Sequence, residues 1–147
     1  ILMDLSKAFD TINHKLLLAK LDIYGFGKSA LCLLNSYLNN RQQRTKVNQS
    51  FSKWSEIKSG VPQGSVLGPL LFNIYVNDLF YIINHTDVCN YADDTTFHAC
   101  GSDINELMLR LEHDFLLAIE WFENNFIKLN EDKCHYLLSG YKHEILW

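Results

Sequence analysis

Two adjacent carboxylates, Asp93 and Asp94, stand inside the tetrad Tyr91-Ala92-Asp93-Asp94. Runs rich in β-branched and aromatic residues flank the tetrad, and this pattern predicts a tight β-hairpin. Carboxylates held side by side repel each other unless a positive charge lies between them. Because hard oxygen ligands suit Mg²⁺ or Mn²⁺, the tetrad favours a divalent-metal site. Taken alone, the four residues also fit an ordinary acidic turn, since Asp is common in turns.

A third carboxylate, Asp4, directly follows the apolar run Ile1-Leu2-Met3. The run is typical of the end of a buried strand, and ligands often lie at such strand ends. Asp4 and the two hairpin acids can meet only if their strands are neighbours in one sheet.

A loop rich in glycine and proline, from Ser59 to Pro69, contains three glycines and both prolines of the chain. Glycine lets another group come close to the backbone, so this composition fits a loop built for close approach. The simpler alternative is a structural turn before the helix that we expect from Pro69 to Phe80.

The remaining pattern predicts an α+β fold with an antiparallel-rich sheet. Asp103 and Glu106 are a plausible capping pair for the clearest helix, whose apolar stripe, including Met108 and Phe126, is expected to be core. The other expected elements are helices over His14–Tyr24 and Ser29–Leu38, strands over Arg44–Val47 and Lys53–Lys58, the long helix over Asp103–Asn125, and a last strand over Cys134–Leu138.

Composition fits one globular domain, because 48% of the 147 residues are hydrophobic and 13% are aromatic. No apolar run is long enough to cross a bilayer and the start lacks signal-peptide features, so we expect an intracellular protein, nuclear or cytoplasmic. Both ends look cut from a longer protein. The four cysteines lack C-x-x-C spacing and are expected to be free thiols. His98 near Cys100, and Cys134 beside His135, match no common zinc pattern.

The net charge of −4 argues against a free-standing nucleic-acid binder. The charge is uneven, because the segment from Arg41 to Lys58 holds five basic residues and one acidic residue, Glu56. A solvated hairpin explains this segment equally well.

These segments together resemble the catalytic motifs of reverse transcriptases. Asp4 to His14 looks like motif A, Ser59 to Leu79 like motif B, and Tyr91 to Asp94 like motif C. Trp121 to Asn130, with Lys133, looks like motif D. The sequences of these motifs are most similar to those of non-LTR (LINE-type) retrotransposons. The resemblance is specific because four motifs occur in order over nearly the whole chain.

The resemblance implies a polymerase palm, with helices packed on one face of the sheet and the strands of Asp4 and the hairpin side by side. It implies an RNA-directed DNA polymerase that joins deoxynucleoside triphosphates to a DNA primer on an RNA template. Two Mg²⁺ ions, for which Mn²⁺ can substitute, are implied as cofactors. Asp4 and Asp93 are expected to be the main metal ligands and Asp94 a supporting one. The fingers and thumb of such a polymerase fall outside this chain.

Four further residues acquire expected roles from the resemblance. Phe9 is similar to an aromatic gate that excludes the 2′-hydroxyl of ribonucleotides, with core packing as the alternative. Gln63 and Gly64 look like contacts to the incoming nucleotide. Lys133 is similar to a lysine proposed to protonate the departing pyrophosphate, with an ordinary surface lysine as the alternative.

Two other classes of protein remain open. A catalytically inactive remnant or nucleic-acid-binding scaffold is the main rival, although all three acids are intact. A generic RNA-recognition fold predicts exposed aromatics on its strands, but an acidic hairpin repels phosphates unless it holds a metal.

Overall fold

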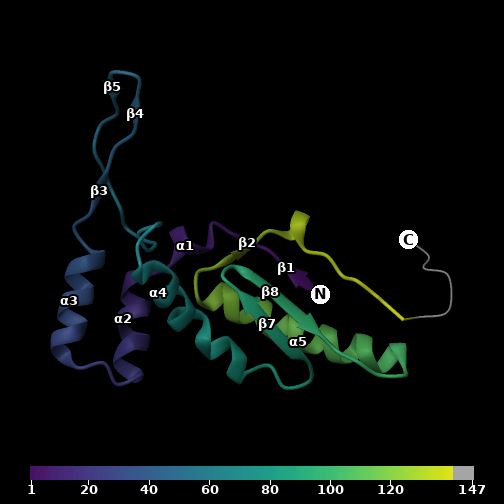
Figure 1. The fold of residues 1–147 in the computed structure, drawn as a ribbon. Coiled ribbons are helices and arrows are strands. Elements are labelled where there is room, and N and C mark those ends of the chain that lie inside the picture. The colour runs from purple at the N-terminus through teal and green to yellow at the C-terminus, as the bar shows by residue number, and fades with distance from the viewer. Residues whose placement is uncertain (141–147) are drawn as a thin grey trace.

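The computed structural model describes residues 1–140 and combines antiparallel strands with packed helices (Figure 1). Its main sheet has three strands in the order β1 (Leu2–Met3), β8 (Asp94–His98) and β7 (Asp87–Tyr91). Both pairings are antiparallel. The long helix α5 (Ile104–Asn124) packs against β8. This arrangement confirms the α+β fold with an antiparallel sheet.

The hairpin of β7 and β8 has a register that leaves only Ala92 and Asp93 in its turn, because Tyr91 pairs with Asp94. On its other edge β8 pairs with β1, with Leu2 opposite Thr96 and Met3 opposite Thr95. Side chains alternate across a strand, and Thr95 and Phe97 accordingly point into the core. The central strand of the sheet is therefore the one that begins at Asp94.

The two helices expected over His14–Tyr24 and Ser29–Leu38 form with nearly those bounds, whereas the short helix α1 (Ala8–Thr11) was not expected. Asn13 caps α2 (His14–Ile23) by accepting a hydrogen bond from the Leu16 amide at 3.1 Å. Helix α2 packs on α3 (Lys28–Leu38) and on α4 (Leu67–Val76). Helix α4 starts two residues before the expected Pro69 and continues as the 3₁₀ helix η1 (Asn77–Tyr81).

Helix α5 buries part of its expected stripe. Asp103 caps it by accepting from the Asn105 amide at 2.8 Å, and Ala118 and Phe122 are buried. Met108 and Phe126 are exposed, so their assignment to the core is wrong. Periodicity identifies one face of a helix, but it does not tell how far along the helix other elements cover that face. No helix within residues 1–140 is long and apolar enough to span a bilayer.

The basic segment forms one long hairpin that extends away from the helices (Figure 1). Strands β4 (Lys46–Val47) and β5 (Ser50–Phe51) pair at its tip. Strands β3 (Gln42–Gln43) and β6 (Ser55–Glu56) pair at its base. A hairpin is confirmed here, but the two expected strands do not pair with each other: Lys46–Val47 pairs with Ser50–Phe51, and Ser55–Glu56 pairs with Gln42–Gln43.

The chain after α5 returns to the first strands. Strand β9 (Lys128–Leu129) pairs with β2 (Leu5–Ser6), and the short 3₁₀ helix η2 (Glu131–Lys133) follows. The expected strand over Cys134–Leu138 is wrong, because His135 makes only an isolated bridge with Leu2. Strand β1 is two residues long, so it offers little edge on which a longer strand could pair.

Candidate active site

Asp4 lies between β1 and β2 and is held by the segment that follows β9. Its backbone carbonyl accepts from the Asn130 amide at 3.0 Å, and its Oδ2 accepts from Asn130 Nδ2 at 2.9 Å. Lys133 Nζ lies 3.6 Å from the same oxygen. Two contacts from one turn therefore fix the Asp4 carboxylate and balance its charge.

The main sheet brings Asp4 to the hairpin. The pairing of β1 with β8 ends at Met3 opposite Thr95, and one further step along this antiparallel register places Asp4 opposite Asp94. The expected neighbourhood of these two strands is confirmed. Asp93 is the neighbouring residue in the hairpin turn. All three acids therefore lie toward one end of the sheet.

The turn that carries Asp93 has an unusual backbone. Ala92 has φ +55°, in the left-handed region that residues other than glycine seldom adopt. Lys7, just after β2, has φ +51°. Each such conformation costs roughly 1–3 kcal/mol, and Asn40, Asn48 and Phe126, which the site does not use, have positive φ as well.

The three carboxylates do not form one tight cluster. Within residues 1–140, the only group of three or more potential ligands whose atoms all lie within 4.8 Å of one another is His85, His113 and Asp114. The hard carboxylate oxygens of Asp4, Asp93 and Asp94 nevertheless fit Mg²⁺ or Mn²⁺ in chemical type. The three acids lie toward the same end of the sheet, but they are not in direct contact.

A cavity of about 400 Å³ opens beside one of these acids, Asp93. It brings together four residues singled out in the sequence, Phe9, Gln63, Gly64 and Asp93, from three separate segments. Lys7, Ala8, Pro62, Gly68 and Pro69 complete its lining. Asp4, Asp94 and Lys133 do not line this cavity.

The glycine-rich loop forms the cavity wall because its backbone is bonded to the segment after Asp4. Gly60 N donates to the Ile12 carbonyl and Val61 N to the Phe9 carbonyl, both at 2.8 Å. A Cβ on Gly60 would lie 2.7 Å from Asp10 Cα, so the close approach expected of this loop is made to the chain itself. The backbones of Gly60 and Asp10 can lie this close only because residue 60 has no side chain.

Two residues that line the cavity, Gln63 and Phe9, also contact other parts of the chain. Gln63 Nε2 donates to Asp10 Oδ1 at 2.8 Å, a contact between distant parts of the chain that sequence reasoning missed. The Phe9 ring lies 4.6 Å from the Phe72 ring and also lines the cavity. Core packing and exposure to the cavity therefore coexist in Phe9.

This fold and set of motifs define a polymerase domain. The family described as reverse transcriptase (RNA-dependent DNA polymerase) matches residues 1–146, and the chain belongs to that family.

The relatives are proteins of non-LTR retrotransposons. The chain is 29% identical over 140 residues to the probable RNA-directed DNA polymerase from transposon BS of Drosophila melanogaster. It is 30% identical over 139 residues to the RNA-directed DNA polymerase from mobile element jockey of the same organism. In both comparisons 90% of this chain is covered, but only 15% of the relative.

A more distant relative is the Pol polyprotein from the type-1 retrotransposable element R2 of Popillia japonica. It is 24% identical over 144 residues, which cover 90% of this chain and 23% of the relative. The chain thus spans a small part of the length of the curated relatives that it matches.

Proposed function

We propose that this chain is the palm of an RNA-directed DNA polymerase within a longer protein of a non-LTR element. It extends a DNA primer on an RNA template with deoxynucleoside triphosphates. The observation that carries the proposal is the cavity shared by Phe9, Gln63, Gly64 and Asp93, together with the pairing of the strand before Asp4 with the strand that begins at Asp94. The single palm domain over residues 1–147 and its intracellular location remain predictions from the sequence.

Asp4, Asp93 and Asp94 are the proposed ligands of Mg²⁺, with Mn²⁺ as a substitute. When bound, these ions supply neutralisation of the charge on the reacting phosphate. The contribution of the chain is to hold the acids in place: strand β8 fixes Asp94, the two-residue turn fixes Asp93, and Asn130 with Lys133 fixes Asp4.

The cavity is the proposed site of the incoming nucleotide. Gln63 is oriented by its hydrogen bond to Asp10, and Gly64 leaves its part of the wall without a side chain. Phe9 rests on Phe72, which limits its movement. A ring held in this way can exclude a 2′-hydroxyl by steric contact.

Primer extension on an RNA template tests the proposal. The chain is assayed in the longer polymerase sequence of its element, with Mg²⁺ and deoxynucleotides, beside an Asp93→Asn variant and an Asp87→Asn control on the same hairpin. We expect Mg²⁺-dependent synthesis that is lost in Asp93→Asn and kept in Asp87→Asn. Synthesis that survives Asp93→Asn would reject the proposed role of the hairpin.

A nucleic-acid-binding scaffold without activity is a second candidate, and the projecting hairpin favours it. Its Arg44 guanidinium stacks 4.0 Å from the Phe51 ring centroid and 4.5 Å from that of Trp54, and both rings are exposed. Basic and aromatic groups combined in this way suit single-stranded nucleic acid. Salt-dependent RNA binding that Arg44→Ala weakens, in a folded protein without any synthesis, would support this candidate.

A further inference from the structure

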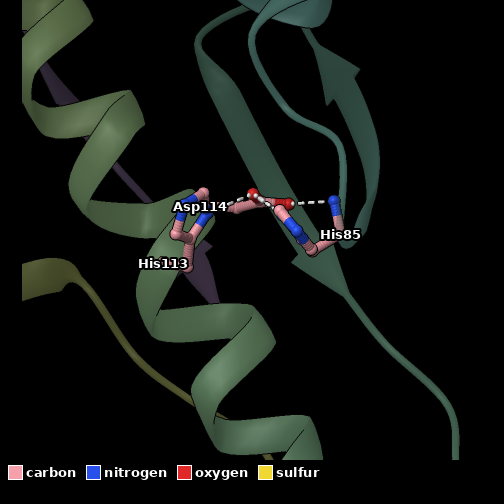
Figure 2. Close-up of side chains that lie close together, drawn as sticks. All are labelled: His85, His113 and Asp114. Atoms are coloured by element: carbon pink, nitrogen blue, oxygen red, sulfur yellow. Dashed lines mark hydrogen bonds and ion pairs between the residues drawn. The ribbon is translucent and has the colours of Figure 1, made fainter.

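A second group of potential ligands lies away from the proposed active site, where α5 meets the segment before β7. His113 and Asp114 project from α5, and His85 comes from the loop between η1 and β7 (Figure 2). His85 Nδ1 and His113 Nδ1 each lie 3.1 Å from Asp114 Oδ1. Two imidazole nitrogens thus converge on one carboxylate oxygen.

The other oxygen of Asp114 is fully occupied by the chain. Oδ2 accepts from the amides of His85 and Thr86 and from Thr86 Oγ1, each at 2.8 Å. These three donors fix the orientation of a completely buried carboxylate. Only Oδ1 is left to face the two rings, so the cluster has a rigid anchor with a supporting shell of hydrogen bonds.

The spacing and accessibility of the three atoms suit a small cation. Zinc bonds of about 2.0–2.1 Å at tetrahedral angles separate neighbouring ligand atoms by roughly 3.3 Å. Each imidazole nitrogen lies 3.1 Å from Asp114 Oδ1, and all three ligand atoms lie within 4.8 Å of one another. The rings of His85 and His113 are 48% and 54% exposed, so a cation can reach their nitrogens from solvent. Arg110, which is partly buried and donates to the His85 carbonyl, is a nearby positive charge that opposes cation binding.

We infer that His85, His113 and Asp114 form a zinc site with three protein ligands, Nδ1 of the two imidazoles and Oδ1 of the carboxylate. Two imidazoles with one carboxylate, and a fourth position open to water, match the ligand composition of open zinc sites. The ion connects α5 to the start of the hairpin that carries Asp93. Its binding therefore stabilises the base of that hairpin.

Cobalt and zinc titration of the whole chain tests the inference. Co²⁺ reports its coordination through its absorption spectrum, and Zn²⁺ competes for the site. The titration is done in excess Mg²⁺, which occupies sites that contain only carboxylates. The variants are His85→Gln and His113→Gln, each of which keeps the other imidazole and the three donors to Asp114 Oδ2. His98→Gln is the matched control, because His98 is also 54% exposed and near a carboxylate, Asp87.

We expect one Co²⁺ per chain, displaced by Zn²⁺, in the wild type and in His98→Gln. Loss of either ligand histidine should weaken binding at least ~10-fold. Zn²⁺ should raise the melting temperature of the wild type and of His98→Gln, but not of the two ligand variants. Absence of Co²⁺ binding in the wild type, or equal binding in all four proteins, overturns the inference.

Discussion

Lys133 Nζ lies 3.6 Å from Asp4 Oδ2, so the short helix η2 places a positive charge beside the first acid of the sheet. The lysine side chain is 66% exposed, and an exposed ion pair adds little to stability. This ion pair alone therefore says little about why a lysine stands here, and its role at the departing pyrophosphate stays a prediction.

Replacing Lys133 tests this prediction. If the ammonium donates a proton to the departing pyrophosphate, Lys133→Ala should slow single-turnover primer extension by about 100-fold or more. Its unfolding free energy should stay within about 0.5 kcal/mol of the wild type. Lys128→Ala on β9 is the control and should leave the rate unchanged. An equal rate in both variants would make Lys133 an ordinary surface lysine.

Phe9 is predicted to select deoxynucleotides through its ring. Phe9→Val should increase the use of ribonucleotides relative to deoxynucleotides by about 10-fold or more, because the smaller side chain leaves room for a hydroxyl. The measurement is the ratio of kcat/KM for the two substrates. Phe72→Leu removes the packing partner of Phe9 from the core and controls for loosened packing. The same change of ratio in Phe72→Leu would contradict a direct role for Phe9.

Gly60 and Gly64 allow a matched test of the glycine-rich loop. Both have positive φ, +85° and +78°, but a Cβ on Gly60 meets Asp10 and Phe9 backbone atoms below 3.0 Å, whereas one on Gly64 meets nothing within 4 Å. Gly64→Ala should cost only the conformational penalty, about 1–2 kcal/mol. Gly60→Ala should cost more, since backbone must move. Chemical denaturation measures both, and equal losses would show that the close approach is unimportant.

We expect the free energy of unfolding to fall at acid pH because of Asp114. Burial alone would raise the pKa of its carboxyl, but hydrogen bonds from His113, His85 and Thr86 outweigh burial and hold the pKa well below its ordinary value of 3.8. A lowered pKa in the folded state gives stability that is present above about pH 4 and lost as the pH falls toward the folded-state value. The carboxylate is faced by the imidazoles of His85 and His113, with Arg110 beyond the His85 carbonyl.

Asp114→Asn removes this titration. At neutral pH it should lower the unfolding free energy by about 2 kcal/mol, because an amide accepts fewer hydrogen bonds than a carboxylate. The difference from the wild type should shrink below pH 4, as denaturation curves at several pH values will show. A constant difference at every pH would mean that the charge of Asp114 is not what stabilises the fold.

Local patterns in the sequence predicted those elements whose cause is local. The hairpin around Asp93, the cap Asp103, and the ranges of α2 and α5 follow from turn chemistry, capping and periodicity, which act within a few residues. The strand over Cys134–Leu138 failed because a strand exists only where a partner edge is available, and β1 is too short to provide one.

The sequence by itself determined which residues can do chemistry: Asp4, Asp93, Asp94, Gln63 and Phe9 stand in recognisable motifs. Tertiary structure decided which of them meet. It set β1, which precedes Asp4, beside β8, which begins at Asp94; it also paired Gln63 with Asp10 and His85 with Asp114. No local pattern encodes these pairs, because each joins segments that approach only when the shared core excludes water and fixes the strand register.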